Sequence, residues 1–414
     1  VYTSEKFIEK MKSRGIDVDA MLAGLKIMYL EQLKQEISKP LLAVGFLLAH
    51  ILPAYSFYRL FGKKTNINDA AAILFSSGSE GAPKGIVLSH RNFMANIKQI
   101  SDVLKTRDDD VVMGCLPPFH SFGLTVTTFL PLIEGIPVVC HPDPTDVVNI
   151  AKAICNNKVT VMCATATFLR LYTKNKKVQP LMLDSLRIVV AGAEKLSLDV
   201  REEFLTKFNK VIYEGYGATE TTPVASVNIP DQLDVNDWHV QVGSKIGTVG
   251  LPLPGCSFRI VDPVSMQTLP PEADGLILIS GTQVMMGYLN DDEKTRSVIV
   301  EIDGRRWYKT GDKGHLDADG FLTIVDRYSR FAKLGGEMVS LGAVEGEIKK
   351  VISEPDVEMV AVNIPDEKKG EKIVLLITLN IDVSEIRKRL LENNCNPMMI
   401  PSTVIHTTEI PKLG

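Results

Sequence analysis

Short apolar segments and helical stretches alternate along most of this chain, and the alternation limits its fold more than any other feature. From Val1 to about residue 260 the apolar segments are rich in β-branched residues and show no alternation of polarity: AAILFSS, VVMGCLP, IPVVCHP, VTVMCAT, LRIVVAGA and KVIYEGYG. Helical stretches such as RNFMANIKQISDVL and LDVREEFLTKF lie between them. Strands that are apolar throughout are typical of parallel sheets buried on both faces. The pattern therefore predicts an α/β fold of parallel sheets covered by helices.

The pattern of predicted strands and helices changes twice along the rest of the sequence. From about residue 247, strands punctuated by Gly and Pro follow one another, as in SFRIVD, GLILISG and FLTIVDRY, and predict a β-rich subdomain over residues 247–326. After residue 326, the helical patterns LGAVEGEIKKVI and VSEIRKRLLE flank the strand patterns EMVAVNI and KIVLLITL. We therefore expect a large N-terminal domain, residues 1–326, and a small α+β C-terminal domain, residues 327–414.

Composition excludes several classes of protein. The formal net charge of −4 gives no basic face for nucleic acid, so no nucleic-acid partner is expected. The six cysteines are scattered, without a Cys-x-x-Cys pair or a histidine at ligand spacing. Reduced thiols in a cytosolic compartment are therefore expected, with no disulfide framework or zinc site. The first residues, VYTSEKFIEKMKSRG, lack the pattern of a signal peptide.

The most apolar run of the chain is LLAVGFLLAHIL, bounded by Pro40 and Pro53. It is shorter than the ~20 residues that a membrane-spanning helix needs. We expect a buried helix here. A peripheral membrane contact through residues 41–57 is the alternative.

The segment ILFSSGSEGAPKG, residues 73–85, has the composition of a phosphate-binding loop. A buried strand is expected to end at Phe75, and a helix to follow in LSHRNFMANI. Between them lie three hydroxyls, three glycines and one lysine: Ser76, Ser77, Ser79, Gly78, Gly81, Gly85 and Lys84. Glycines allow successive N–H groups to face an anion, while hydroxyls and a lysine add donors and charge. The spacing is not that of the GxxxxGK[ST] loop, and an ordinary polar surface loop is the competing interpretation.

Three further segments place nucleotide-binding chemistry after predicted strands. In EGYGATE, Tyr216 offers a flat face for a purine, Thr219 a donor to phosphate, and Glu220 an oxygen ligand suited to Mg²⁺. VVAGAEKL, residues 189–196, ends a strand in small residues that allow a ring to approach the backbone. In WYKTGD, the carboxylate of Asp312 can accept hydrogen bonds from a ribose diol.

In this order and spacing, the segments resemble those of the adenylate-forming enzymes, a family that includes acyl-CoA synthetases, firefly luciferase and peptide-synthetase adenylation domains. The resemblance runs from Val1 to Gly414 and implies ATP and Mg²⁺ as cofactors, with Glu220 as the metal ligand. It further implies that Tyr216 stacks on adenine and that Asp312 binds the ribose. It assigns catalytic roles to four residues: Lys84, His120 (in LPPFHSFG, beside the carboxylate substrate), Thr219 and Glu220.

The full set of residues that the resemblance assigns to ATP or AMP binding falls in the same segments and at the junction with the small domain. They are Ser76, Ser77, Gly78, Ser79, Glu80, Gly81, Gly85, Gly192, Ala193, Glu194, Glu214, Gly215, Tyr216, Gly217, Asp312 and Arg327. In relatives the small domain is mobile and turns about a hinge residue, usually Asp or Lys, where this chain has Ser329. The segment Gly335, Gly336 and Glu337 would then line the path of the thiol.

Several segments, above all RFAKLGGEMVSL, are most similar to the synthetase half of bacterial bifunctional acyltransferase/acyl–acyl-carrier-protein synthetases. This similarity implies activation of a long-chain fatty acid through an acyl-adenylate and its transfer to acyl carrier protein, serving phospholipid acylation. It also implies an acyltransferase preceding Val1 in the parent protein and a location in the cytoplasm at the inner face of the bacterial inner membrane. The alternatives are an acyl-CoA synthetase, which uses CoA as the acceptor, and a nucleotide-binding module without full catalysis.

The chain ends in TEIPKLG. Relatives continue with a Ser/Thr-Gly-Lys segment whose lysine takes part in adenylation, so we expect both ends to be cuts and that catalytic lysine to lie beyond Gly414. A chain extended by a few residues is expected to form the adenylate better than this one.

Other short patterns are ascribed to chance or to the surface. HPDPTD, residues 141–146, fits the His-x₄-Asp pattern of glycerolipid acyltransferases by coincidence. RDDDVV is expected to be a solvated turn, and KNKK and DEKKGEK to be surface charge.

Overall fold

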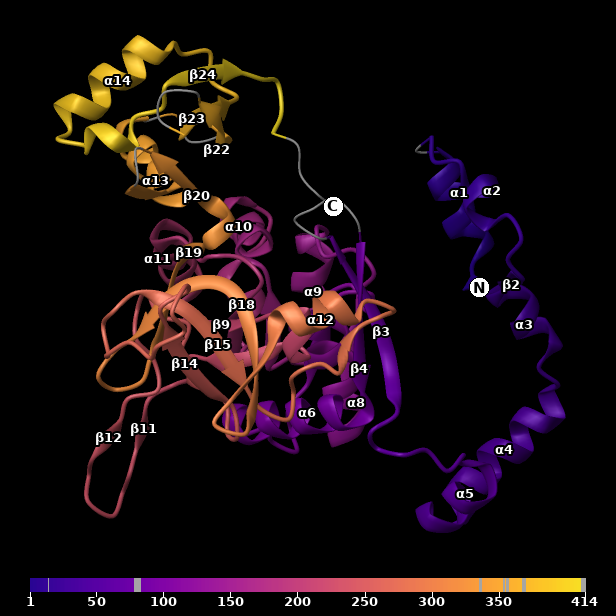
Figure 1. Cartoon of the computed structure of the whole chain (residues 1–414). Helices are drawn as coiled ribbons and strands as arrows, with labels where there is room; N and C mark the ends of the chain where they lie inside the picture. The colour runs from indigo at the N-terminus through magenta and orange to yellow at the C-terminus, as the bar shows by residue number, and fades with distance from the viewer. Residues whose placement is uncertain are drawn as a thin grey trace. The chain divides into compact units, whose positions relative to one another are not determined.

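The computed structural model describes residues 1–13, 15–77, 83–334, 337–352, 354, 357–366 and 370–410. Contacts divide the chain into two compact units, Val1–Asn66 and Ile67–Gly414 (Figure 1). The boundary that the sequence places between residues 326 and 327 lies inside the second unit and stays a prediction.

The first unit begins with a strand–helix–strand motif. β1 (Tyr2–Thr3) pairs in parallel with β2 (Met28–Tyr29), and α1 (Glu5–Ser13) and α2 (Val18–Leu22) lie between them in the chain. Three further helices follow: α3 (Leu30–Glu36), α4 (Lys39–Ile51) and α5 (Ala54–Phe61).

The expectation of a buried helix over the apolar run is wrong in one respect. The helix forms as α4, but none of its residues, all of which the structure describes, is buried. Among the described residues of this unit, Val18 is the one buried hydrophobic side chain, so the unit has no core large enough to cover α4. No helix among the described residues is long and apolar enough to cross a membrane.

The central sheet of the second unit confirms the predicted parallel α/β core. Its strand order is β13–β10–β9–β8–β7–β5–β6, and the run from β9 to β6 is parallel. β10 and β13 join antiparallel at one edge. The strands are β5 (Val112–Gly114), β6 (Val138–Cys140), β7 (Val161–Ala164), β8 (Ile188–Ala191), β9 (Ile212–Gly217), β10 (Val224–Val227) and β13 (Leu251–Pro252).

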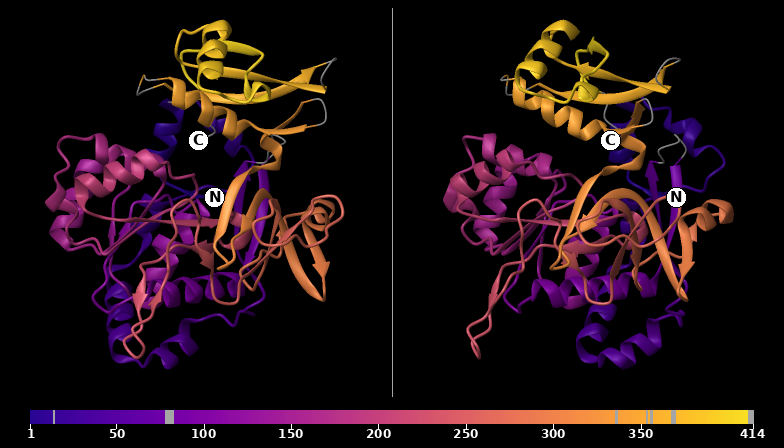
Figure 2. Two further views of the ribbon diagram at one scale, coloured as in Figure 1. Left: turned by 90° about the vertical axis from the view of Figure 1, so that its left-hand side faces the viewer. Right: turned by 60° about the vertical axis from the view of Figure 1, so that its left-hand side comes forward.

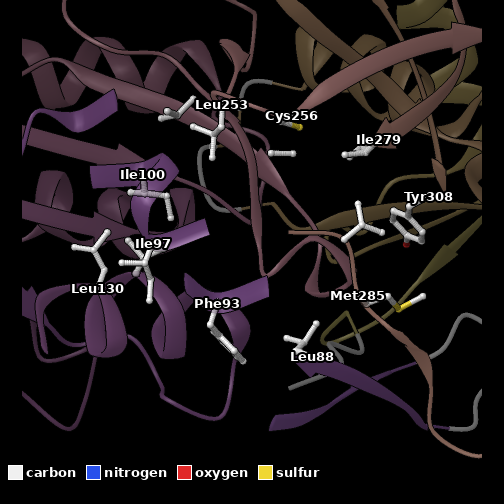
Figure 3. Packing of buried hydrophobic residues seen from close by; sticks show 14 of the residues in the cluster. Leu88, Phe93, Ile97, Ile100, Leu130, Leu253, Cys256, Ile279, Met285 and Tyr308 are labelled. Carbon is white, nitrogen blue, oxygen red and sulfur yellow. The ribbon is translucent and has the colours of Figure 1, made fainter. Parts of the chain in front are cut away.

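Both faces of this sheet are buried, as the unalternating strand sequences predict. Along β8, Ile188 and Val190 belong to one apolar cluster, while Val189 and Ala191 belong to another. The first cluster includes residues of α6 (His90–Leu104) and α8 (Leu130–Glu134), some of which Figure 3 shows. The second includes residues of α9 (Val147–Asn157), α10 (Ala166–Lys174) and α11 (Leu198–Phe208). Between α6 and α8 the chain forms α7 (Ser121–Leu124) and a π-helical turn (Thr125–Phe129).

The segment predicted to bind phosphate does not join a parallel strand to a helix. β3 (Ala70–Ser77) and β4 (Pro83–Ser89) are antiparallel neighbours in a three-stranded sheet with β16 (Gly287–Tyr288), and α6 begins only at His90. The prediction of a buried strand ending at Phe75 is also wrong, because the Phe75 side chain is 66% exposed. The two faces of β3 differ: Leu74 is buried, and Ile73 is exposed.

The region after residue 247 is rich in strands, as predicted, and these strands pair antiparallel. The sheet order is β14–β15–β18–β17, with β19 on β18. Its strands are β14 (Ser257–Val261), β15 (Gly275–Ser280), β17 (Ile299–Ile302), β18 (Arg305–Leu316) and β19 (Leu322–Arg327), with α12 (Asp292–Val298) before β17. A separate hairpin, β11 (Gln232–Leu233) and β12 (Val240–Gln241), precedes it.

The C-terminal residues, orange to yellow in Figure 2, form an α+β arrangement with a core of its own. The sheet order is β21–β20–β23–β22, with β24 parallel to β23. Its elements are β20 (Phe331–Leu334), β21 (Glu337–Ser340), α13 (Leu341–Val351), β22 (Met359–Asp366), β23 (Gly370–Ile377), α14 (Val383–Glu392) and β24 (Thr403–His406).

Candidate active site

The carboxyl end of β9 presents the aromatic and acidic residues of EGYGATE. After Gly217 the chain makes a 3₁₀ turn, Thr219–Thr221. A Cβ atom on Gly217 would lie 1.9 Å from the carbonyl oxygen of Pro223, so no other residue fits this close approach. In open α/β sheets, ligands bind at the carboxyl ends of parallel strands. Tyr216 lies near the end of β9 and Glu220 within the 3₁₀ turn, at that edge.

Tyr216 and Asp312 meet in a buried polar contact. The Tyr216 hydroxyl donates a 2.5 Å hydrogen bond to Oδ2 of Asp312, and Arg327 Nε lies 3.3 Å from Oδ1. Burial raises the pKa of Asp312, although the Tyr216 hydroxyl and Arg327 oppose the shift. Burial, with the Asp312 charge, also raises the pKa of Tyr216 well above its usual range. The structure thus brings together three residues that the sequence places 96 and 15 positions apart.

Glu220 has a partner that the sequence analysis missed. The hydroxyl of Tyr288, in β16, donates a 2.9 Å hydrogen bond to Glu220 Oε1. Lys84 Nζ lies 5.6 Å from the centre of the Tyr288 ring, within the range of a cation–π contact. Burial and the Glu220 carboxylate raise the pKa of Tyr288, so the phenol keeps its proton and acts as a donor at neutral pH. Tyr288 therefore connects the lysine of the predicted phosphate loop to the predicted metal ligand.

No spacing pattern could have revealed Tyr288, because it lies 68 residues from Glu220 in the sequence. Its segment, GYLNDDEKT, reads as a turn and a short helix. The link depends on the pairing of β16 with β4, in which Tyr288 is opposite Ile86.

The described part of the β3–β4 hairpin carries the ends of the predicted phosphate loop. Ser76 is paired with Lys84 and Ser77 with Pro83. The carbonyl of Gly85 accepts a 2.7 Å hydrogen bond from the Leu289 N–H, which anchors the hairpin to the β16 segment. Four of the predicted residues lie outside the described residues: Gly78, Ser79, Glu80 and Gly81.

The LPPFHSFG segment reaches the same turn. His120 is exposed and directly precedes α7, and the next residue, Ser121, has its hydroxyl 3.3 Å from Oγ1 of Thr219. The predicted phosphate donor Thr219 is therefore held next to the histidine segment.

Two predicted nucleotide-binding carboxylates are already engaged within the protein. Glu194 Oε2 accepts hydrogen bonds of 2.9 and 2.7 Å from the N–H and hydroxyl of Thr167. Glu214 forms an ion pair with Arg201, which limits the rise that burial causes in the Glu214 pKa. Contacts to a nucleotide stay a prediction for this group of strand-end residues: Gly192, Ala193, Glu194, Glu214, Gly215 and Gly217.

The end of β19 and the turn that follows it lie at the junction of the two predicted domains. Asp326 Oδ2 accepts hydrogen bonds of 2.5 Å from the Ser340 hydroxyl and 3.0 Å from the Gly342 N–H, so it anchors the start of α13. The predicted hinge, Ser329, lies in a 3₁₀ turn, Tyr328–Arg330. Glu337 begins β21 and is exposed, while Gly335 and Gly336 lie outside the described residues.

The residues present fit Mg²⁺ held mainly by a bound nucleotide. No group of three His, Cys, Asp or Glu side chains that could hold a metal occurs in the part of the chain that the structure describes. Mg²⁺ commonly binds through one or two carboxylates together with substrate phosphates. Tyr288 donates one hydrogen bond to Oε1 of Glu220, and the carboxylate lone pairs that remain could hold the metal.

By fold and by sequence, the chain belongs to the class of adenylate-forming enzymes. It belongs to the AMP-binding enzyme family, whose sequence pattern matches residues 28–289. This confirms the family resemblance found in the sequence.

Named relatives support the same conclusion. The chain is 31% identical over 314 residues to a long-chain-fatty-acid–CoA ligase of Salmonella typhimurium, a match that covers 75% of this chain and 53% of the relative. It is 35% identical over 281 residues to a probable 4-coumarate–CoA ligase of Dictyostelium discoideum, with 67% of this chain and 48% of the relative covered. The chain thus spans about half the length of these relatives.

Solved structures share the fold. ATP-bound MatB from Rhodopseudomonas palustris has a TM-score of 0.73 and 27% identity, and the match covers 85% of this chain and 67% of MatB. The o-succinylbenzoate CoA synthetase of Bacillus subtilis, in complex with its acyl-adenylate, has a TM-score of 0.76, and the match covers 99% of this chain and 75% of that one. At 23% identity it is evidence for the fold alone.

Proposed function

We propose that this protein activates a fatty acid with ATP through an acyl-adenylate and transfers the acyl group to the thiol of CoA. The observation that carries the proposal is the strand-end site, in which Tyr216, Asp312 and Glu220 converge in an AMP-binding enzyme. The similarity to a long-chain-fatty-acid–CoA ligase supports a fatty acid as the substrate and CoA as the acceptor.

In the first half-reaction, a carboxylate oxygen of the acid attacks the α-phosphorus of ATP, and the bond to pyrophosphate breaks. Negative charge on the phosphate oxygens must be stabilised in this step. Lys84 and Thr219 would supply a positive charge and a hydroxyl donor, and losing one such preorganised group typically costs ~10²–10³ in rate. Bound Mg²⁺ would neutralise phosphate charge, and Glu220, oriented by Tyr288, would hold it.

Other residues would bind the substrates. Tyr216 offers its ring to the adenine, and the buried carboxylate of Asp312 its oxygens to the ribose diol. Both Asp312 oxygens have protein partners in this structure. The side chain of Arg327 is largely exposed, so nucleotide binding would replace its contact with Asp312 by one from a ribose hydroxyl. His120 would lie beside the carboxylate of the acid, next to Thr219.

In the second half-reaction, the thiol would attack the acyl carbon and displace AMP. Ser329 would act as the hinge, and residues 335–337 would line the thiol path. Acyl carrier protein is the second candidate acceptor, favoured by the RFAKLGGEMVSL segment. Several of the matched relatives bear the name of CoA ligases, which favours CoA.

The acceptor can be tested without depending on adenylate formation. The chain is supplied with palmitoyl-adenylate and either CoA or phosphopantetheinylated acyl carrier protein, and thioester formation is measured. We expect palmitoyl-CoA to form much faster than palmitoyl-carrier protein. Faster formation of palmitoyl-carrier protein would show that acyl carrier protein, not CoA, is the acceptor. If the chain formed no thioester with either thiol, the remaining interpretation would be a nucleotide-binding module without full catalysis. Coumaroyl-adenylate in place of palmitoyl-adenylate tests the acid, and is expected to react more slowly.

A further inference from the structure

We propose that α4 and α5 form a surface that binds anionic phospholipid membranes. This surface, residues 39–64, lies wholly within the first unit and is independent of the proposed ligase activity. In Figure 1, α4 and α5 are consecutive helices joined by a bend at Leu52 and Pro53.

The first observation is the apolar exposure of α4. Its sequence, KPLLAVGFLLAHI, is apolar on every side, a pattern that normally belongs to a helix buried in protein or lipid. Nevertheless all of its large apolar side chains except the half-buried Leu48 are exposed, with Leu41 at 69% and Ile51 at 68%. Isolated exposed apolar residues are common, but a contiguous patch marks an interaction site.

Helix α4 is too short to span a membrane. Its 13 residues extend over only ~20 Å, against ~30 Å for the hydrocarbon core of a bilayer. A helix of this kind can instead lie in the interface with its side chains inserted below the headgroups.

The second observation is α5, which has the composition of an interfacial helix. Tyr55 and Tyr58 are exposed, and aromatic residues of this kind favour the headgroup level of membranes. The bend between the two helices also borders an open hollow of about 430 Å³, and its lining is mainly apolar: Ala49, Leu52, Ala54, Phe57, Tyr58, Phe61 and Gly62.

The third observation is charge, which selects an anionic membrane over a second copy of the chain. From Ile37 to Asn68 there are four basic residues and no acidic one, a formal charge of +4 in a chain whose net charge is −4. The basic residues are Lys39, Arg59, Lys63 and Lys64, and all four are exposed. Two copies packed through this surface would bring like charges together, whereas an anionic lipid surface attracts each Lys or Arg.

Co-sedimentation of the whole 414-residue chain with vesicles tests the proposal. We expect binding to vesicles of phosphatidylcholine with phosphatidylglycerol, weaker binding to phosphatidylcholine alone, and weakening by salt. The double change Leu42→Ser with Leu47→Ser should reduce the partition coefficient roughly tenfold or more. Lys63→Glu with Lys64→Glu should reduce it by a similar factor for the anionic vesicles.

Matched control variants distinguish binding through this surface from non-specific adsorption of the chain to vesicles. Val264→Ser removes a side chain that is 91% exposed elsewhere, and Lys176→Glu with Lys177→Glu reverses a basic pair of the second unit; neither should change binding. Circular dichroism establishes that each variant keeps its helices. Absence of binding to the anionic vesicles, or equal losses in the control variants, would overturn the proposal. So would a result in which the leucine changes dissociate an oligomer and leave vesicle binding unaltered, because a second copy would then be the occupant.

Discussion

The Tyr288 hydroxyl donates a hydrogen bond of 2.9 Å to Oε1 of Glu220, and this contact joins the β16–β4 pairing to the end of β9. It fixes one oxygen of the carboxylate proposed to hold Mg²⁺. We therefore expect Tyr288→Phe to lower fatty-acid-dependent ATP–pyrophosphate exchange roughly tenfold, the equivalent of one hydrogen bond of ~1.4 kcal/mol. The Mg²⁺ concentration for half-maximal rate should rise as well.

Tyr172→Phe is the matched control, since the buried Tyr172 hydroxyl has no hydrogen-bond partner among the residues that the structure describes. It should leave both kinetic quantities unchanged. A Tyr288→Phe enzyme with the parent's Mg²⁺ dependence would show that the contact has no positioning role.

Removal of the Glu220 carboxylate should have a larger effect. We expect Glu220→Ala to reduce exchange by ~10²–10³, because the proposed metal ligand is lost in a step that builds charge on phosphate. The thermal unfolding transition should remain cooperative. Unchanged exchange in this variant would contradict the Mg²⁺ assignment.

The buried carboxylate of Asp312 is expected to lower the free energy of unfolding at neutral pH and to contribute to ligand binding. Its pKa in the folded protein is raised above the 3.8 of an ordinary carboxyl, mainly by burial. Such a group contributes stability that is fully present below the unfolded pKa and is lost as the pH rises through the folded pKa. Asp312→Asn should therefore be at least as stable as the parent at neutral pH, and the advantage should shrink as the pH falls towards 3.8.

The same variant should bind ATP roughly tenfold more weakly, because a neutral amide oxygen accepts a weaker hydrogen bond from a ribose hydroxyl than a carboxylate oxygen does, and the amide nitrogen accepts none. Urea unfolding at several pH values and calorimetric titration with ATP measure the two effects. Loss of stability at neutral pH with unaltered ATP affinity would contradict both.

Asp110 should show the opposite dependence on pH. Burial would raise its pKa, but hydrogen bonds from Arg187 and Thr160 outweigh burial and hold the pKa below 3.8. Its contribution is therefore present above the unfolded pKa and is lost as the pH falls through the folded value. Asp110→Ala should cost about 3 kcal/mol at neutral pH, since it leaves a largely buried Arg187 without its partner. Asp102→Ala, at an exposed pair with Lys98, should change the free energy of unfolding by less than about 1 kcal/mol.

The anchor of α13 on Asp326 can be tested by two glycines of the same helix. A Cβ at Gly346 would have no atom within 4 Å, so Gly346→Ala should stabilise the protein by ~1 kcal/mol through helix propensity. A Cβ at Gly342 would lie 2.8 Å from Asp326 Oδ2, so Gly342→Ala should give no gain or a loss. Equal stabilisation by the two substitutions, measured by chemical unfolding, would show that Asp326 does not constrain the start of α13.

The sequence predicted the parallel sheet because that signal is local. Each of its strands is a short apolar run, and burial of alternate residues on two faces, as at Ile188 and Val189, requires no knowledge of distant partners. The β3–β4 hairpin was not predicted, because the sequence pattern assigns the residues of β4 to the end of the loop and the start of the following helix, and does not reveal their pairing with β3 and β16. Propensity carries no information about such pairings.

In the candidate site, too, residues in recognisable local segments could be predicted, and residues that depend on distant strand pairings could not. Tyr216, Glu220 and Asp312 belong to segments with a recognisable order, and the structure brings Tyr216 and Asp312 into contact. Tyr288 could not be identified, because its role depends on a contact between strands distant in the sequence. The exposure of α4 also escaped prediction, since a run of apolar residues does not reveal whether its own unit has a core to bury it.

The most direct test of the account is calorimetric titration of the chain with a hydrolysis-resistant palmitoyl-adenylate and with AMP. We predict competitive binding at one site, with the palmitoyl compound bound roughly a hundredfold more tightly, a gain that burial of ~4 methylene groups would supply. Asp312→Asn should weaken both ligands. Equal affinities for the two compounds, or binding that Asp312→Asn leaves unaltered, would contradict a fatty acyl-adenylate site at the end of β9.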